Sequence, residues 1–300
     1  MTFSNSIKNQ NNLITTLFVD VYGVLHEGGN LFPGVKESLE KYKKYYKIII
    51  ISNTTPECEE VIKSLSTKGL EQGVHYDAVI TSGDVFIEEI KNNKSLIYTM
   101  YSKYPTFEKY SIPQTSDITQ AQNVYIGIPQ NEKGEDIKIF DVVEEGKSVM
   151  SFLKDKNYKL DFIEKYIESL KGKKVYCANS DLVAIKDGEM CVRQGFVGLY
   201  LQNRNIDVKF FGKPYRNIFE KALREHNVKP QNVLMIGDQY STDLGCDSLG
   251  LNTALIRSQI TDLTKDLEYF HNKICTPDVE VKHIAELERF LTENRIRAEK

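Results

Sequence analysis

The sequence has no long hydrophobic run and no block of basic residues. Its longest apolar run, Ile48 to Ile51, fits a buried strand, whereas a bilayer-spanning helix needs about 20 apolar residues. With 39 basic and 42 acidic side chains, the net charge is −3. We therefore expect neither a nucleic acid nor a membrane as a main partner. The opening segment MTFSNSIKNQNN is polar and lacks the apolar core of a secretory signal, so no signal is expected.

The cysteines are few and scattered. There are five, at Cys58, Cys177, Cys191, Cys246 and Cys275, and their spacing matches neither a disulfide framework nor a zinc site. We expect a reduced, cytoplasmic protein in which most of these thiols are buried.

What the sequence does contain is typical of a soluble globular protein. Hydrophobic residues make up 41% and charged residues 27% of 300 residues, which excludes a disordered or fibrous chain. This length suits an α/β domain accompanied by a smaller one. No internal repeat or low-complexity linker is evident.

Short apolar strands alternate with amphipathic helices along the first 83 residues. A strand at 17–19 ends at Asp20, apolar positions at 35–46 repeat with helical spacing, and a second strand follows at 48–51. Thr55 is expected to cap the next helix and Pro56 to begin it. This β-α-β rhythm predicts a parallel sheet in a doubly wound, Rossmann-like α/β core.

The middle of the chain has shorter apolar runs and is predicted to be an inserted second domain over residues 84–192. It contains candidate strands at 124–128 and 175–178 and a helix at 160–170. From Val208 the strand-helix rhythm returns with VKFF, followed by strands at 233–236 and 254–256 and an amphipathic helix near the C-terminus. The predicted core is therefore discontinuous, comprising residues 1–83 and 193–300.

Polar side chains follow strands of the predicted core sheet at Asp20, Ser52, Lys213 and Asp238. The carboxyl ends of strands in open α/β sheets line the ligand crevice. Asp20 could be a nucleophile, a metal ligand or a loop-capping carboxylate. Asp238 and the nearby Asp243 would repel each other unless a cation lay between them, and hard oxygen ligands suit Mg²⁺. Helix capping is the alternative for Asp243.

Four segments, DVYGVL, ISNTT, FFGKP and MIGDQYSTD, occur in this order and resemble the four motifs of the haloacid dehalogenase-like superfamily. The insertion resembles a class II α/β cap domain. TSGDV at 81–85 and NSD at 179–181 are similar to the nitrophenylphosphatase and pyridoxal-phosphatase branch, subclass IIA. The resemblance covers nearly all of residues 15–258.

The resemblance implies a Mg²⁺-dependent phosphatase that hydrolyses a small phosphorylated metabolite. Asp20 would be the nucleophile that forms an aspartyl phosphate. Ser52 and the backbone N–H groups around Asn53 would hold the phosphoryl oxygens, and Lys213 would offset the negative charge. The simpler alternatives are that Ser52 caps a strand end and that Lys213 is a solvated loop charge.

The same resemblance implies a metal site. Asp20, Asp238 and the main-chain carbonyl of Tyr22 would hold Mg²⁺, while Asp243 would orient the metal shell. In the cap, Asn179 and Asp181 either face the substrate or form an ordinary turn. The sequence leaves the oligomeric state open, a homo-oligomer included.

Tyr22 departs from the family pattern, because phosphatases of this superfamily usually have a second Asp two residues after the nucleophile. That Asp protonates the leaving oxygen, a contribution worth roughly 10²–10⁴-fold. Haloacid dehalogenases have a Tyr at this position and use no metal, so a metal-independent dehalogenase is one alternative. A non-catalytic phosphate-binding protein is another, and His26 could be a substitute proton donor or an ordinary loop residue.

Overall fold

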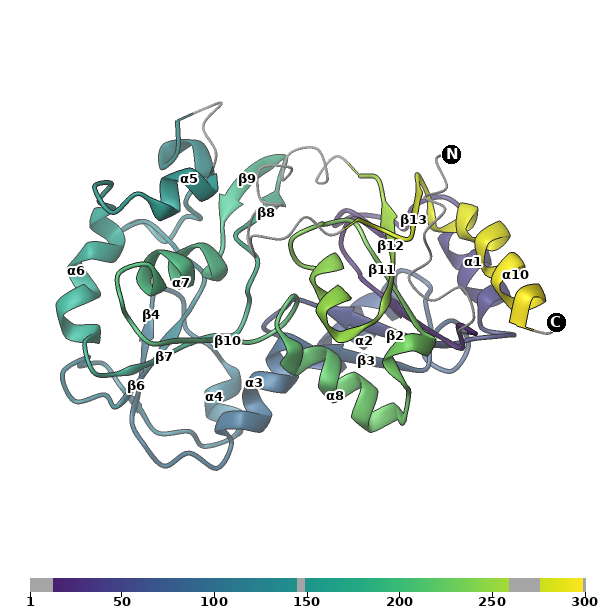
Figure 1. Ribbon diagram of the computed structural model, residues 1–300. Coiled ribbons are helices and arrows are strands. Elements are labelled where there is room, and N and C mark those ends of the chain that lie inside the picture. The colour runs from purple at the N-terminus through teal and green to yellow at the C-terminus, as the bar shows by residue number, and fades with distance from the viewer. Residues whose placement is uncertain (1–12, 145–148, 259–275, 299–300) are drawn as a thin grey trace. The chain divides into compact units, whose positions relative to one another are not determined.

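The computed structural model describes residues 13–144, 149–258 and 276–298 and divides into two compact units (Figure 1). The first unit comprises Met1–Ser52, Pro56–Thr81 and Lys213–Lys300, and the second comprises Asn53–Thr55 and Ser82–Gly212. The second unit thus runs on to Gly212, beyond the boundary at residue 192 that the sequence predicts.

The first unit is built on a six-stranded sheet of order β13-β12-β11-β1-β2-β3, and all of its strand pairs are parallel. β1 lies between β11 and β2, with Val19 paired to both Ile236 and Ile50. The first-unit elements are β1 (Thr16–Val19), α1 (Val35–Tyr42), β2 (Lys47–Ser52), α2 (Cys58–Thr67), β3 (Ala78–Thr81), α8 (Arg216–His226), β11 (Val233–Gly237), β12 (Asn252–Ile256), β13 (Val279–Val281) and α10 (Leu287–Ala298), with short 3₁₀ turns at Pro230–Asn232, Leu244–Leu249 and Ile284–Glu286.

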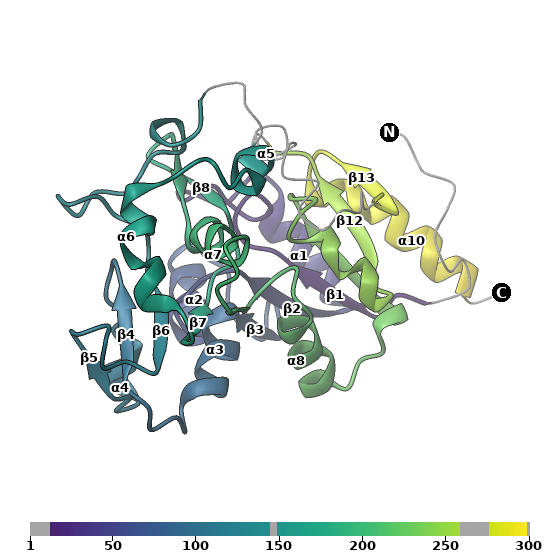
Figure 2. The same ribbon diagram turned by 60° about the vertical axis from the view of Figure 1, so that its left-hand side comes forward.

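The first unit buries alternate strand residues on opposite faces of this sheet. Leu17, Ile48 and Leu234 belong to one core cluster with residues of α1, α2 and α10. Figure 1 shows α1 and α10 side by side, and the turned view of Figure 2 shows α10 beside β13; the Tyr42 hydroxyl joins α1 to the turn before α10 by donating to the Ile284 carbonyl oxygen at 2.7 Å. Strands buried on both faces read as continuous apolar runs, which is why the sequence predicted this parallel core correctly.

The second unit has its own five-stranded parallel sheet of order β10-β7-β6-β4-β5, with a separate antiparallel hairpin formed by β8 and β9. Its elements are α3 (Ser82–Ile90), β4 (Ile97–Met100), α4 (Thr106–Lys109), β5 (Gln114–Thr115), β6 (Asn123–Ile126), a 3₁₀ turn (Ile139–Asp141), α5 (Val149–Lys154), α6 (Asp161–Leu170), β7 (Lys174–Cys177), β8 (Val183–Lys186), β9 (Glu189–Val192), α7 (Gln194–Gln202) and β10 (Val208–Phe210).

Two local predictions are wrong. The strand that begins at Val208 belongs to the second sheet and not to the core, because Val208 pairs with Val175 of β7. A short apolar run has the same appearance in any parallel sheet, so the pattern alone could not assign it. Helix α2 begins at Cys58 rather than at Pro56, because Glu57 has an extended backbone (φ −73°, ψ 166°) and takes the N-cap position expected for Thr55.

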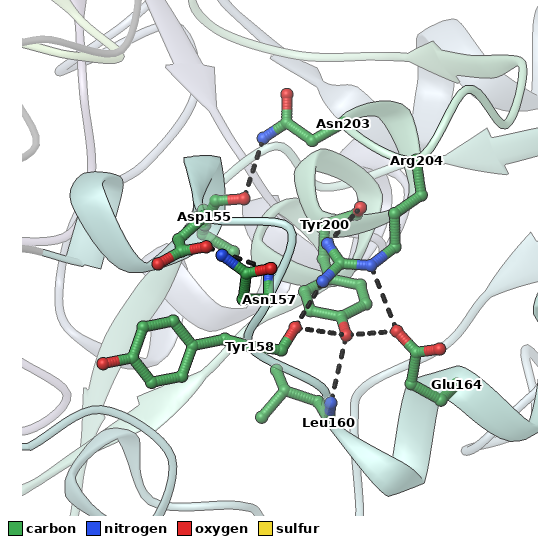
Figure 3. Close-up of polar contacts among 9 residues, drawn as sticks. Asp155, Asn157, Tyr158, Leu160, Glu164, Tyr200, Asn203 and Arg204 are labelled. Carbon is green, nitrogen blue, oxygen red and sulfur yellow. Dashed lines mark hydrogen bonds and ion pairs between the residues drawn. The ribbon is translucent and has the colours of Figure 1, made fainter.

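A polar cluster in the second unit ties the loop between α5 and α6 to α7 (Figure 3). The fully buried Tyr200 hydroxyl lies 2.5 Å from Oε1 of Glu164 and accepts the Leu160 N–H at 3.0 Å. The Arg204 guanidinium stacks 3.5 Å from the centre of the Tyr200 ring and donates to Glu164 and to the Tyr158 carbonyl. These contacts join one fully buried hydroxyl to half-buried polar groups of the same unit, which marks the cluster as structural.

Burial of the thiols agrees with expectation within the described ranges. Cys177, Cys191 and Cys246 are buried and Cys58 is half-buried, whereas Cys275 lies outside the described residues. Within the same ranges, no helix has both the length and the apolar character needed to cross a bilayer.

Candidate active site

Asp20 directly follows β1 at the carboxyl edge of the first-unit sheet. Its N–H continues the strand pairing by donating to the Ile236 carbonyl oxygen at 2.9 Å. Ser52 is the last residue of the neighbouring β2, and both side chains are buried. Parallel pairing therefore places these two polar groups at the same end of adjacent strands, as the sequence predicts.

Lys213 is buried between two carboxylates. Its ammonium lies 2.5 Å from Oδ1 of Asp20 and 2.6 Å from Oδ1 of Asp243, and only 2% of the residue is exposed. The solvated-loop alternative for Lys213 is therefore wrong. The expectation that Lys213 follows a core strand is also wrong, because it reaches the site from the loop after β10 of the second sheet.

Asp243 uses both of its carboxylate oxygens within the protein. While Oδ1 contacts Lys213, Oδ2 accepts the backbone N–H groups of Asp238 and Gln239, each at 3.0 Å. These bonds fix the loop that follows β11. Asp243 therefore shapes the strand end and contacts Lys213. The element after it is a 3₁₀ turn, not the helix that the capping alternative assumed.

Asp238 is fully buried at the end of β11, and its Oδ2 accepts a hydrogen bond from the Ser258 hydroxyl at 2.7 Å. Ser258 is not among the residues predicted from the sequence. A usable signal existed, because Ser258 lies two residues beyond Ile256, the end of the adjacent strand β12. Applying the strand-end rule to every strand of the sheet would have found it.

Two glycines make room for these carboxylates. Gly23 has φ +83°, and a Cβ there would lie 2.0 Å from Oδ2 of Asp238. A Cβ on Gly237 would lie 2.1 Å from Cγ of Asp243. Backbone and carboxylates approach so closely that neither position can carry a side chain without displacing a site residue.

Burial and neighbouring charges shift the pKa values of three ionisable groups in the site. Burial raises the pKa of Asp20 to about 7, with Lys213 opposing the shift and Asp243 adding to it. Burial also raises the pKa of Asp238 well above its ordinary value, and repulsion from Asp243 and Asp20 contributes. Burial by itself would lower the pKa of Lys213, but the Asp20 and Asp243 carboxylates outweigh it and raise that pKa.

The donor set fits a hard divalent cation. Asp20, Asp238 and Asp243 each offer a carboxylate oxygen, and these oxygens lie within 4.8 Å of one another. The Lys213 ammonium offsets only one of three possible negative charges. A cation that prefers oxygen ligands, such as Mg²⁺, would remove the remaining repulsion and favour ionised carboxylates.

Tyr22 and His26 lie close together in the loop after β1. Their ring centres are 6.1 Å apart in an edge-on arrangement, and Tyr22 is half-buried. His26 Nδ1 accepts the Gly28 N–H at 2.9 Å. Burial, assisted by the Lys68 ammonium, lowers the pKa of His26 to about 4, so its imidazole is neutral near pH 7. A neutral imidazole is a weak acid, which argues against His26 as a substitute proton donor.

The remaining predicted residues meet one another within the second unit. The Asn53 side-chain amide donates to Oδ1 of Asp181 at 2.8 Å and to the Ser180 hydroxyl at 3.2 Å. The Asp181 N–H in turn donates to Oδ1 of Asn179 at 2.9 Å. The NSD segment is thus a hydrogen-bonded turn that contacts Asn53, a pairing that the sequence did not predict.

Three family models of haloacid dehalogenase-like hydrolases match consecutive parts of the chain, over residues 17–108, 106–245 and 210–287. Together they span the four motifs and both units. These matches show that the chain is similar to haloacid dehalogenase-like hydrolases, as its four motifs predict.

Known proteins agree with this assignment. A glyceraldehyde 3-phosphate phosphatase of Methanothermobacter thermautotrophicus is 32% identical over 88 residues, which are 29% of this chain and only 39% of that relative. A haloacid dehalogenase-like hydrolase of Brucella suis 1330 has a similar structure, with a TM-score of 0.71, 20% identity and coverage of 92% of this chain and 98% of that one. The 4-nitrophenylphosphatase of Thermotoga maritima gives a TM-score of 0.65 at 18% identity, with coverage of 94% and 98%.

The two structural likenesses concern the fold, and they extend over the inserted unit as well as the core. This is the architecture that the resemblance to subclass IIA predicts. At 20% and 18% identity they do not transfer a substrate.

Proposed function

We propose that the protein is a Mg²⁺-dependent phosphatase that hydrolyses a phosphoric monoester of a small metabolite through Asp20. The observation that carries this proposal is the buried Asp20 carboxylate at the end of β1, with the Lys213 ammonium 2.5 Å away. A nucleophilic carboxylate and a dianionic phosphate repel each other, so a fixed cation beside the carboxylate is what the chemistry requires.

In the proposed reaction an Asp20 oxygen attacks phosphorus, and an aspartyl phosphate forms as the ester P–O bond breaks. Water then attacks phosphorus and releases Asp20 and inorganic phosphate. Lys213 offsets the charge between carboxylate and phosphate, and Ser52 holds a phosphoryl oxygen. Asp20, Asp238 and the Tyr22 carbonyl are the proposed ligands of Mg²⁺, which when bound supplies further charge neutralisation of the phosphoryl group.

The raised pKa of Asp20 supports a role for this cation. A pKa of about 7 leaves part of the carboxylate protonated at neutral pH, and a protonated carboxyl is a poor nucleophile. A divalent cation bound to the cluster would lower that pKa again. Metal binding and nucleophile activation are therefore linked in this proposal.

Tyr22 defines the substrate range that we expect. A phenol, whose pKa is ordinarily about 10, is a weak proton donor near pH 7, so esters with good leaving groups should react best. Aryl and acyl phosphates are accordingly preferred over alkyl phosphates. The names of the similar proteins, a 4-nitrophenylphosphatase and a glyceraldehyde 3-phosphate phosphatase, are compatible with a phosphatase of small esters.

The first prediction is that Asp20→Asn lowers kcat for 4-nitrophenyl phosphate with Mg²⁺ by at least about 10³-fold, because an amide cannot be phosphorylated. Release of 4-nitrophenolate is the measurement, and far-ultraviolet circular dichroism checks the fold. Asp187→Asn is the matched control, because Asp187 lies exposed in the turn between β8 and β9. It should leave kcat unchanged.

The same assay separates the alternatives. Release of halide from a 2-haloacid in EDTA, without hydrolysis of any phosphate ester, would replace the proposal by a dehalogenase, the function that Tyr22 favours next. Tight binding of inorganic phosphate without turnover of an acyl phosphate would instead identify a phosphate-binding protein.

A further inference from the structure

The three residues after Ser52 belong to the second unit, and each makes a hydrogen bond with another part of it. Asn53 donates to Asp181 and Ser180, at 2.8 and 3.2 Å. The Thr54 carbonyl accepts the Ser82 hydroxyl at 2.9 Å and the Gly83 N–H at 3.0 Å. The Thr55 carbonyl accepts the Tyr104 hydroxyl. The strand that carries Ser52 therefore continues into a segment whose conformation the second unit determines.

Gly212, the residue before Lys213, packs against the same segment. It has φ +99°, and a Cβ at this position would lie 2.4 Å from Oδ1 of Asn53 and 2.8 Å from Cβ of Ser82. The preceding Phe211 N–H donates to the Cys177 carbonyl at 2.9 Å. Asn53 and Gly212 are thus in contact. A peptide bond joins Asn53 to Ser52, and another joins Gly212 to Lys213.

Asp181 is the charged member of this arrangement. Its Oδ1 accepts the Asn53 amide, and its N–H donates to Asn179. The turn is packed closely, since a Cβ on Gly195 would lie 2.1 Å from the Ser180 carbonyl oxygen. A charge-assisted hydrogen bond from a fixed turn restricts the rotamer of Asn53 and hence the backbone next to Ser52.

We infer that Asp181 is a positioning residue for the reaction: through Asn53 and Gly212 it sets the placement of Ser52 and Lys213, and it does not bind substrate. This inference rests on the proposed function. Misplacement of catalytic groups by about 1 Å can cost roughly 10²-fold in rate even when the residue changed is remote from the chemistry. Because Lys213 and Ser52 act on the phosphoryl group common to every ester, the loss should be the same for all substrates.

The test is a double-mutant cycle of Asp181→Ala and Asn53→Ala, assayed on 4-nitrophenyl phosphate and on an alkyl phosphate with Mg²⁺. Each single variant should lower kcat/KM about 10- to 100-fold, and by the same factor on both esters. The double variant should be no slower than the slower single variant, because both changes break one contact. Asp181→Asn keeps an oxygen acceptor for Asn53 and should recover kcat/KM to within about fivefold of the wild type.

Tyr200→Phe is the control for a merely structural effect, because it removes a part-buried hydrogen bond elsewhere in the same unit. It should lower stability and leave kcat/KM unchanged. Multiplicative losses in the double variant, a kcat/KM loss that differs between the two esters, or failure of Asp181→Asn to recover kcat/KM would overturn the positioning role. If Asp181→Ala does not fold, the comparison of Asn53→Ala with Asp181→Asn still decides the question.

A wild-type protein without turnover would refute the proposed function separately. Titration calorimetry with inorganic phosphate and Mg²⁺ then takes the place of the rate. Phosphate affinity should fall at least 10-fold in Asp181→Ala and recover in Asp181→Asn. Equal affinities in all variants would overturn the inference.

Discussion

Asp238 and Asp243 are the same residue type in one loop, yet their hydrogen-bond partners differ. Oδ1 of Asp243 contacts Lys213, and its Oδ2 accepts two backbone N–H groups. Asp238 accepts a hydrogen bond from the Ser258 hydroxyl and belongs to the same carboxylate cluster as Asp20. A carboxylate already engaged through both oxygens supports a metal site better than it ligates the metal.

We therefore predict that Asp238→Asn weakens Mg²⁺ binding at least about 100-fold and Asp243→Asn only about 10-fold. Asparagine keeps the size of each side chain, so the two variants are matched. Titration calorimetry with MgCl₂ measures both affinities. An Asp238→Asn protein that binds Mg²⁺ as tightly as the wild type would show that the assignment is wrong.

His26 predicts a pH dependence of stability. Its pKa is about 4 in the folded protein because of burial and the Lys68 ammonium, against about 6.5 in the unfolded chain. Between these values the unfolded state binds the proton and the folded state does not. The contribution of the neutral His26 imidazole to the free energy of unfolding is therefore present above pH 6.5 and is lost as the pH falls towards 4.

The free energy of unfolding should accordingly fall by roughly 2 kcal/mol more between pH 7.5 and pH 5 in the wild type than in His26→Gln. Urea titrations of both proteins at the two pH values give this difference. Parallel pH profiles for the two proteins would mean that His26 takes up its proton without opposing the fold.

At the scale of elements, the Tyr200 cluster anchors the connection between α5 and α6 to α7 (Figure 3). Tyr200→Phe removes the hydroxyl of a fully buried side chain and leaves the half-buried Glu164 carboxylate and Leu160 N–H without this partner. It should lower the free energy of unfolding by about 1–3 kcal/mol. Tyr158→Phe changes a side chain that is 39% exposed in the same loop and should cost less than about 0.5 kcal/mol.

Thermal or urea unfolding of the two variants decides this prediction. Equal losses in Tyr200→Phe and Tyr158→Phe would mean that the cluster contributes no more than an exposed hydroxyl.

The elements also show where pattern reading succeeds. β1, β2 and β11 were predictable because strands buried on both faces are continuous apolar runs that end at polar residues. β10 was equally visible, but its sheet was not, because Val208 and Phe210 fit β7 as well as any core strand. The start of α2 was misplaced because Thr55 and Pro56 fit the cap and first-turn preferences, whereas the extended backbone of Glu57 moves the cap two residues along the chain.

For the whole molecule, the sequence predicts the doubly wound core and the residues that end its strands, because both depend on local order. The motif FFGKP predicted Lys213 as a site residue. It did not predict that the strand before Lys213, β10, belongs to the second sheet. The contacts of Asn53 with Asp181 and of Asp238 with Ser258 depend on tertiary proximity. No spacing rule in a single sequence encodes such pairs.

The position of β1 between β2 and β11 has a consequence for synthesis on the ribosome. β2 emerges soon after β1, but the other edge of β1 stays open until the segment containing Ile236 has left the exit tunnel. The strands of the second sheet, β4 to β10, are all translated before then, so that sheet can close while the first is incomplete. Asp20 is translated long before Lys213 and Asp243, so these three side chains come together only after residue 243 has left the exit tunnel.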